Sequence, residues 1–189
     1  MYTYVILLRA INVGGKNKIV MQELKKYLEE LGFSSVSTFI ASGNVILASD
    51  WHPVKIKAQI EAMLTTRFQL DSEIIKVLVL NPKQLQSIID NKPKDFGCQP
   101  DRYHSDVIFL IDVDTPQVMV TFNPREGVDT IWPGDGVIYA QRLSVERSKS
   151  RLSTISALPF YKSLTIRNWN TVTKLLAILE DRDTFTSSK

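Results

Sequence analysis

Apolar residues in the first part of the chain follow two kinds of pattern. Residues 2–8 are almost all β-branched, aromatic or aliphatic, which is typical of a buried strand. A polar loop follows, and apolar residues then return at helical spacing until Gly32, which stands where a glycine commonly ends a helix. The apolar positions of this predicted helix are Met21, Leu24, Leu28 and Leu31.

The chain continues with a predicted hairpin, a second helix and a closing strand. Two short apolar runs, 36–40 and 45–47, are joined by a Ser-Gly-Asn sequence whose chemistry suits a tight turn. A second amphipathic helix begins near Pro53, and residues 74–80 form an apolar strand. The resulting order is β-α-β-β-α-β, which predicts a ferredoxin-like unit.

The second half repeats this order of elements without any residue-level repeat. Asn81 and Pro82 predict the start of a bridging helix, and the aperiodic residues 91–102 predict a loop. The elements predicted after it are a strand (107–111), a short helix (116–122), a hairpin (130–132 and 137–140), a weak helix (149–158), a strand (164–166) and a final helix carrying Val172, Leu175, Leu176 and Leu179. The prediction is therefore an α+β protein of two ferredoxin-like units with a bridging helix and a C-terminal helix, divided into segments 1–80, 81–102 and 103–189.

Composition restricts the class of protein further. With 44% hydrophobic and 23% charged residues, the chain of 189 residues is neither disordered nor of low complexity. The single cysteine, Cys98, excludes an intrachain disulfide framework and a multi-cysteine metal site. No apolar run reaches the roughly 18–20 residues of a membrane span, and the N-terminus lacks the features of a signal peptide. We therefore expect a soluble cytoplasmic protein.

Charge is distributed unevenly although the formal net charge is only +3. Residues 140–175 contain a single acid, Glu146, against seven basic residues. These are Arg142, Arg147, Lys149, Arg151, Lys162, Arg167 and Lys174. The stretch could form a basic face, or its charges could simply be solvated.

Three segments are more specific than composition, and together they resemble a known family. They are residues 7–18 (LLRAINVGGKNK), 38–45 (TFIASGNV) and 167–172 (RNWNTV). They are similar to the uncharacterised bacterial family catalogued as domain of unknown function 1697, and the likeness covers nearly the whole chain. The chain departs from the family pattern at Ala10, where the family has glycine, and at Ile166, where it often has threonine. The resemblance implies an α+β fold and no established activity.

The loop at residues 10–17 nearly matches the G-x-x-x-x-G-K-[ST] phosphate-binding pattern. Ala10 replaces its first glycine, and Asn17 replaces the hydroxyl that would bind magnesium. The tight hairpin after the first helix also disagrees with the parallel sheet that nucleotide hydrolases of this class need. A weaker anion nest stays open, in which Gly14 and Gly15 expose backbone N–H groups beside Lys16. The alternative is a plain turn with solvated lysines.

The closing motif offers a second group of polar residues. Asn168 or Asn170 can cap the N-terminus of the last helix, and Arg167 can donate two hydrogen bonds to phosphate or carboxylate. In the structural alternative, Trp169 is buried and Arg167 pairs with an acid. Arg9, at the end of the first strand, either lies at the rim of the sheet or joins a polar site.

No catalytic group emerges from the remaining reactive side chains. Cys98 and His104 lack an orienting third group, and His52 suits a capping or surface role. Two histidines and one cysteine, scattered along the chain, make no metal site, and no cofactor is predicted. The sequence therefore favours a binding protein over an enzyme.

We expect the three motifs to converge on a polar pocket for an anionic, phosphate-bearing small ligand, with charge and oriented amides but no base or nucleophile. Its predicted residues are Arg9, Asn12, Gly14, Gly15, Lys16, Asn17, Ser42, Asn44, Arg167, Asn168 and Asn170. Two alternatives stay open. Tyr139, Tyr161 and Trp169 could stack bases in a single-stranded nucleic-acid-binding module, although the sequence pI of 8.9 is only mildly basic. The chain could also be a protein-interaction module without a ligand.

Overall fold

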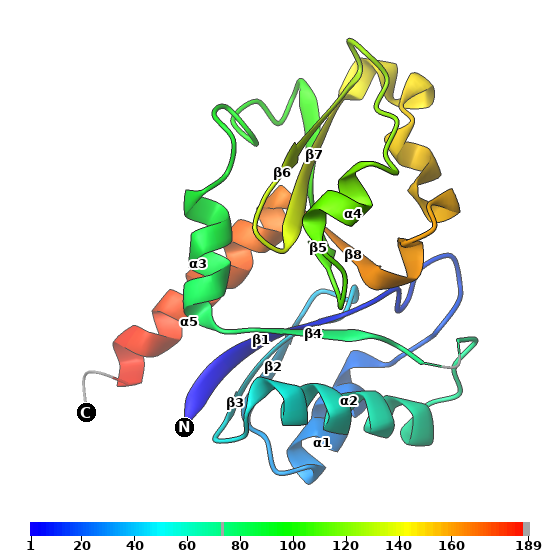
Figure 1. Ribbon diagram of the computed structural model, residues 1–189. Coiled ribbons are helices and arrows are strands. Elements are labelled where there is room, and N and C mark those ends of the chain that lie inside the picture. The colour runs from blue at the N-terminus through cyan, green and yellow to red at the C-terminus, as the bar shows by residue number, and fades with distance from the viewer. Residues whose placement is uncertain (73, 187–189) are drawn as a thin grey trace. The chain divides into compact units, whose positions relative to one another are not determined.

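The computed structural model describes residues 1–72 and 74–186 of the chain (Figure 1). It is a mixed α+β protein with two four-stranded antiparallel sheets. Its contacts divide the chain into two compact units. Unit 1 contains residues 1–85 and the C-terminal segment from Leu175, and unit 2 contains residues 86–174. The sequence-based segments 1–80, 81–102 and 103–189 stay a prediction about domain boundaries.

Unit 1 contains all the elements predicted for the first part of the chain. They are β1 (Tyr2–Leu8), α1 (Met21–Glu30), β2 (Ser34–Phe39), β3 (Asn44–Ser49), α2 (Pro53–Arg67) and β4 (Val77–Leu80). The strand order is β2-β3-β1-β4, and each neighbouring pair is antiparallel. The closing strand is shorter than predicted, since it begins at Val77 and not at residue 74.

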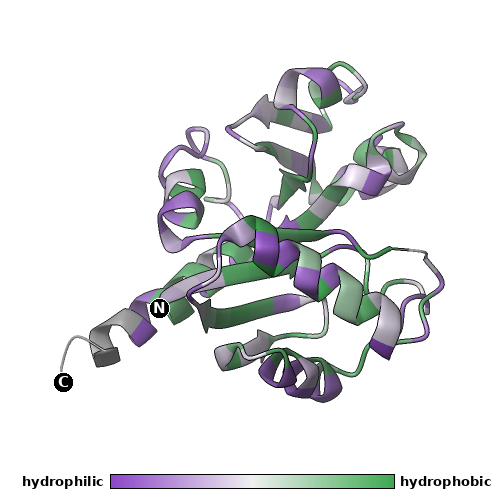
Figure 2. Cartoon of the chain, turned by 60° about the horizontal axis from the view of Figure 1, so that its bottom comes forward, coloured by the Kyte–Doolittle hydropathy of each residue, from purple (hydrophilic) through white to green (hydrophobic). Residues whose placement is uncertain are grey.

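The core of unit 1 lies between one face of this sheet and the two helices. Alternate residues of β1, among them Ile6 and Leu8, are fully buried in the same apolar cluster as Leu24 of α1 and Ile60 of α2. In Figure 2 the strands are largely hydrophobic in colour, whereas the helices carry both hydrophobic and hydrophilic surfaces. The helical spacing found in the sequence therefore marks the buried stripes of α1 and α2.

Two helix starts confirm capping predictions. α3 (Pro82–Asp90) begins with a reciprocal box, in which the Gln84 N–H donates to Asn81 Oδ1 (2.8 Å) and the Asn81 N–H donates to Gln84 Oε1 (2.9 Å). At the start of α2, the His52 side chain accepts a hydrogen bond from the Val54 N–H. His52 therefore has the local capping role expected from the sequence.

Unit 2 has the same order of strands around its own sheet. Its elements include β5 (Tyr103–Leu110), α4 (Thr115–Met119), β6 (Asp129–Pro133), β7 (Val137–Leu143) and β8 (Leu164–Asn168). The sheet order is β6-β7-β5-β8, again antiparallel throughout. The last helix, α5 (Trp169–Thr186), begins in unit 2 and continues into unit 1, where Arg182 Nη1 donates to the carbonyl of Ser35 in β2 (2.8 Å).

The prediction of one helix over residues 149–158 is wrong, because this region contains short 3₁₀ stretches. The structure has three short 3₁₀ stretches between β7 and β8: η1 (Ser144–Lys149), η2 (Leu152–Ala157) and η3 (Tyr161–Ser163). Ser150 separates the first two because its backbone is extended and its hydroxyl donates to the Asp129 carboxylate. The Ser153 hydroxyl also donates to a nearby carbonyl, so hydroxyl groups compete with the hydrogen bonds of a regular helix.

No helix within residues 1–72 and 74–186 is long and apolar enough to span a membrane.

Candidate functional site

The loop after β1 forms a small hairpin whose tip is exposed. The Lys16 N–H donates to the Val13 carbonyl (3.1 Å), and Gly14 and Gly15 between them have φ angles of +59° and +77°. Such angles suit glycine and match a tight primed turn. Within the described part of the chain, a Cβ at either glycine would meet nothing within 4 Å. The tip therefore presents open backbone beside the exposed Lys16 side chain.

The amide of Asn12 closes the base of this loop. Its Nδ2 donates to the carbonyls of Ile19 (2.9 Å) and Ala41 (2.8 Å), while its Oδ1 accepts from the Ile19 N–H (2.8 Å). Both ends of the side chain are thus engaged with the backbone, so Asn12 holds the loop in shape.

Asn17 does the same from a buried position. Only 3% of the residue is exposed, and its Oδ1 accepts from the N–H groups of Asp71 (3.0 Å) and Ser72 (3.1 Å). Its Nδ2 donates to the Ala10 carbonyl and to the Ser72 hydroxyl. This network ties the loop to the segment that precedes β4.

The turn between β2 and β3 is also packed from within. Asn44 is fully buried, and its Nδ2 donates to the Phe39 carbonyl and to Ser42 Oγ, each at 3.0 Å. Gly43, at φ +79°, lies so close to Leu8 and Ile11 that a Cβ would come within 2.9 Å of each. Arg9 is half-buried at the end of β1, where its N–H donates to a carbonyl just before β4. A ligand role for all these residues stays a prediction.

The closing motif belongs to unit 2. Asn168 Oδ1 accepts from the Asn170 N–H (3.0 Å), so Asn168 is the cap of α5 and Asn170 is an exposed first-turn residue. Arg167 is buried, and burial lowers its pKa to about 10. Its Nη1 donates to Thr165 Oγ1 (2.9 Å) and to the Ile166 carbonyl (2.8 Å). The predicted convergence joins residues of two units and stays a prediction.

Two of the three aromatic residues considered for base stacking belong to the core. Tyr139 is 1% exposed and donates its hydroxyl proton to the Ile88 carbonyl (2.6 Å), and Trp169 is 8% exposed. Both pack edge-to-face on Phe96, each with ring centroids 5.3 Å apart. The structural interpretation of Trp169 is confirmed.

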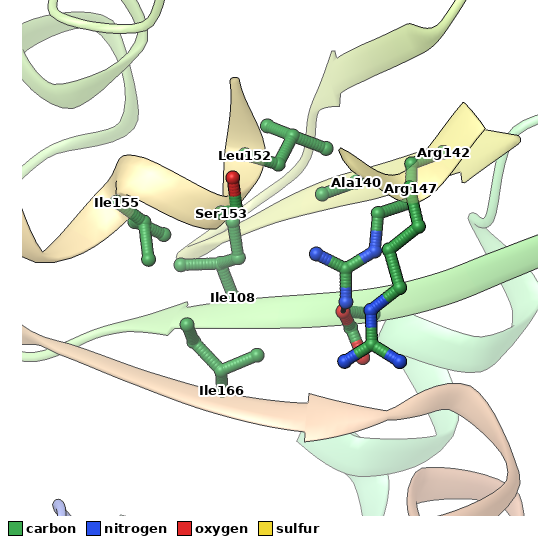
Figure 3. Close-up of a pocket in the computed structure, with 9 residues that line it drawn as sticks. Ile108, Ala140, Arg142, Arg147, Leu152, Ser153, Ile155 and Ile166 are labelled. Carbon is green, nitrogen blue, oxygen red and sulfur yellow. Dashed lines mark ion pairs between the residues drawn. The ribbon is translucent and has the colours of Figure 1, made fainter. Parts of the chain in front are cut away.

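A pocket of about 350 Å³ lies on the face of the unit 2 sheet opposite to the face that carries Arg167. Ile166 lines this pocket, and side chains of consecutive strand residues point to opposite faces, so the neighbouring Arg167 points away from it. Residues of η1 and η2 line the pocket opposite the sheet. Its lining residues are Asp106, Ile108, Ala140, Arg142, Arg147, Leu152, Ser153, Ile155 and Ile166, eight of which are labelled in Figure 3.

The two arginines give this pocket its chemistry. Arg142 Nη2 lies 3.7 Å from Asp106 Oδ2, and His104 Nε2 lies 3.1 Å from the other oxygen of the same carboxylate. Arg142 Nε is buried, and no described residue accepts its hydrogen bond. Arg147 is exposed and lines the same pocket, and both arginine side chains are drawn in Figure 3. Two arginine side chains therefore line the pocket.

A second acid, Asp129, also lies close to Arg142 but has its own donors. Burial alone would raise the pKa of this carboxyl. The pKa is nevertheless lowered, because the carboxylate accepts hydrogen bonds from the Ser150 hydroxyl and from the N–H groups of Arg125 and Arg151. The positive charge of Arg142 lowers it further. Asp129 thereby anchors the start of the 3₁₀ segment η2 to β6.

The sequence interpretation missed this pocket, although a signal was present. In the sequence, Arg142 and Arg147 stand out only as members of the basic stretch at residues 140–175. Alternation along the strand puts Arg142 on the same face as Ala140 and Ile138, and such a cation beside an apolar strand face needs a partner. The structure also brings no group of three or more His, Cys, Asp or Glu side chains together in its described part. What it offers at the pocket is a set of cationic donors suited to binding.

Two antiparallel α+β units define the class of this protein, and comparisons with known proteins agree. The chain belongs to the family described as "Protein of unknown function (DUF1697)", whose model matches residues 1–139. Arg142 and Arg147 lie beyond the matched residues. The chain is similar in structure to the conserved bacterial protein SP0830 from Streptococcus pneumoniae, with a TM-score of 0.80 and 27% identity over 94% of this chain and 98% of that one. No curated protein matches the sequence.

Proposed function

We propose that this protein binds an anionic, phosphate-bearing small ligand, and that the pocket of unit 2 provides the main contact. The observation that carries the proposal is the pair of guanidinium groups at the pocket, from Arg142 and Arg147. A guanidinium presents a planar fork of N–H donors that matches the oxygens of phosphate or carboxylate.

The hydrogen bonding of Arg142 supports this proposal. Its contact with Asp106 is 3.7 Å long, beyond the usual range of a hydrogen bond, and its Nε–H has no acceptor among the described residues. Buried donors without acceptors are rare because each costs about 1–3 kcal/mol. An oxyanion bound by the two arginines would supply hydrogen-bond acceptors for the Arg142 guanidinium. It would replace or share the contact that Arg142 makes with Asp106.

The loop of unit 1 remains a second proposed anion contact. The open tip at Gly14 and Gly15 leaves backbone N–H groups beside Lys16, which is the arrangement of an anion nest. The amides of Asn12 and Asn17 would support such a contact indirectly, because they fix the loop and are themselves engaged with the backbone. At both contacts the residues would bind and position the anion, and the proposal includes no reaction.

Other parts of the proposal concern class and location. The strand order in both units supports a ferredoxin-like arrangement, with the 3₁₀ stretches taking the place of the second helix in unit 2. The single, exposed Cys98 suits a reducing compartment, and we propose a cytoplasmic protein.

The test is a titration of the full chain with phenyl phosphate. Calorimetry measures the binding, and thermal unfolding measures the stabilisation by the bound ligand. We expect Arg142→Gln and Arg147→Gln each to weaken binding about tenfold or more, because a charge-assisted hydrogen bond contributes about 1.5–3 kcal/mol. Lys149→Gln is the matched control, since Lys149 pairs with Glu146 (2.7 Å) and does not line the pocket.

Lys16→Gln separates the two contacts. If this variant abolishes binding while both arginine variants retain it, the loop of unit 1 is the site and the pocket is not. Absence of any saturable binding would refute the proposal. Binding of a single-stranded oligonucleotide with a steep salt dependence, and of no small anion, would instead favour the nucleic-acid alternative.

A further inference from the structure

The pocket of unit 2 has two chemically different ends. Its polar end contains Arg142, Arg147 and the Asp106 carboxylate, and its other end contains branched aliphatic side chains together with Ser153. Figure 3 shows Ile155, Ile108 and Ile166 grouped together, away from the two guanidinium groups. Three elements supply this apolar end: β5, β8 and η2.

The strand register explains why the two ends are separated. On β5, Asp106 and Ile108 point to the same face, and Ile108 lies directly opposite Ile166 of β8. Position 106 lies opposite Ala140 of β7, and the next same-face position of that strand is Arg142. Moving along the strands by one pair of residues therefore changes the lining from charged to aliphatic.

We infer that the ligand is amphiphilic: an anionic head group bound at Arg142 and Arg147, joined to a short apolar body that lies against Ile108, Ile155 and Ile166. This inference rests on the proposed function and names the ligand class for the same site. A phosphate ion or a small hydrophilic phosphate would satisfy the arginines but leave the exposed parts of Ile155 and Ile166 in contact with water. An apolar body removes that surface from water, which is favourable in proportion to the area buried.

The size of the pocket limits the apolar body. Its volume of about 350 Å³ lies at the lower end of the range for small-molecule sites and is roughly twice that of the 150 Å³ apolar cavity known to hold a benzene ring. A head group together with one ring, or with an alkyl chain of similar volume, fits this space.

The experiment is a calorimetric series on the full chain with inorganic phosphate, methyl phosphate, butyl phosphate and hexyl phosphate, with butyrate and hexanoate as carboxylate counterparts. We expect affinity to rise roughly three- to fourfold for each added methylene that is buried. Hexanoate reports whether the head group is carboxylate or phosphate, since the apolar gain is common to both.

Ile155→Ala should lower the ratio of the affinity for hexyl phosphate to that for methyl phosphate about fivefold or more. The affinity for inorganic phosphate should not change. Val145→Ala is the matched control, because Val145 belongs to the neighbouring η1, is 88% exposed and does not line the pocket. Ile166→Ala, on β8, provides a second test if the first variant repacks.

The outcomes separate this inference from the proposed function. Binding of phosphate that depends on Arg142 but is insensitive to chain length would overturn the amphiphile and keep the anion site. A chain-length gain unaffected by Ile155→Ala and Ile166→Ala would place the apolar body elsewhere and also overturn it. Loss of all anion binding would refute the proposed function itself.

Discussion

The two units share one order of strands but cover the corresponding faces of their sheets differently. In unit 1 the segment between the third and fourth strands is α2, a helix of 15 residues that buries Ile56, Ile60 and Leu64 completely. In unit 2 the corresponding segment is three short 3₁₀ stretches, and Leu152 is the residue of η1 and η2 that is buried.

The pocket of unit 2 lies between its sheet and this less regular cover. A regular helix presents a continuous apolar stripe that can seal a sheet face, whereas short 3₁₀ pieces with changing direction cannot. The strand order determines which residues share a face. The crossing segment determines how completely that face is covered: in unit 2 Ile108, Ala140 and Leu152 are buried in a core cluster, and the pocket lies beside them.

The strongest test of this comparison removes one large side chain from each cover. Leu64→Ala in α2 should lower the free energy of unfolding by about 2–5 kcal/mol, because Leu64 is fully buried and its loss leaves a cavity. Ile155→Ala should cost only about 1 kcal/mol, because this half-buried residue already borders open space. Urea unfolding followed by circular dichroism measures both. Equal losses would contradict the idea that one face is sealed and the other is not.

The second test concerns the polar side chains of the loop in unit 1. Asn17→Ala should destabilise the protein by about 2–4 kcal/mol, since it removes a buried amide and leaves the N–H groups of Asp71 and Ser72 without their acceptor. Lys16→Ala, one residue away and exposed, should change stability by less than about 0.5 kcal/mol. A large effect of Lys16 on folding would mean that its charge is structural.

The third test compares two glycines with similar backbone angles. Gly43→Ala should cost about 2–3 kcal/mol, because the new Cβ is strained at positive φ and also collides with Leu8 and Ile11. Gly14→Ala should cost only about 1 kcal/mol, since it has the strain without the collision. Unfolding curves of the two variants, recorded side by side, give the difference. Similar values for both would show that the collision is relieved by small shifts.

The sequence predicted the strands and most helices because hydrophobic periodicity reports burial directly. The weak helix that it predicted over residues 149–158 is wrong, because the bond from Ser150 to Asp129 that interrupts this segment is a tertiary contact. The intrinsic helix propensity of a segment carries no information about such tertiary contacts.

The candidate site was harder to predict for a related reason. Asn12, Asn17 and Asn44 are predicted ligand contacts, but an asparagine that bonds to the backbone and one that binds a ligand look alike in a sequence. The cap at Asn168 could be predicted, because it needs only neighbouring residues. Arg142 and Arg147 required the strand register and the path of η1, which no short motif encodes.

The smallest expected effect concerns the carboxylate that anchors the cover of unit 2. Asp129→Asn should lower the free energy of unfolding at neutral pH by about 1–2 kcal/mol, because the amide is a poorer acceptor for the Ser150 hydroxyl and two N–H groups. Since the pKa of Asp129 is lowered in the folded protein, its stabilisation is present above the ordinary value of 3.8 and is lost as pH falls below it. The gap between wild type and Asp129→Asn should therefore narrow as the pH is lowered from about 7 to about 3. Asp135→Asn, at an exposed position, is the control and should match wild type at every pH. A constant gap would mean that Asp129 acts through its shape alone, and that its charge does not hold the 3₁₀ segment over the pocket.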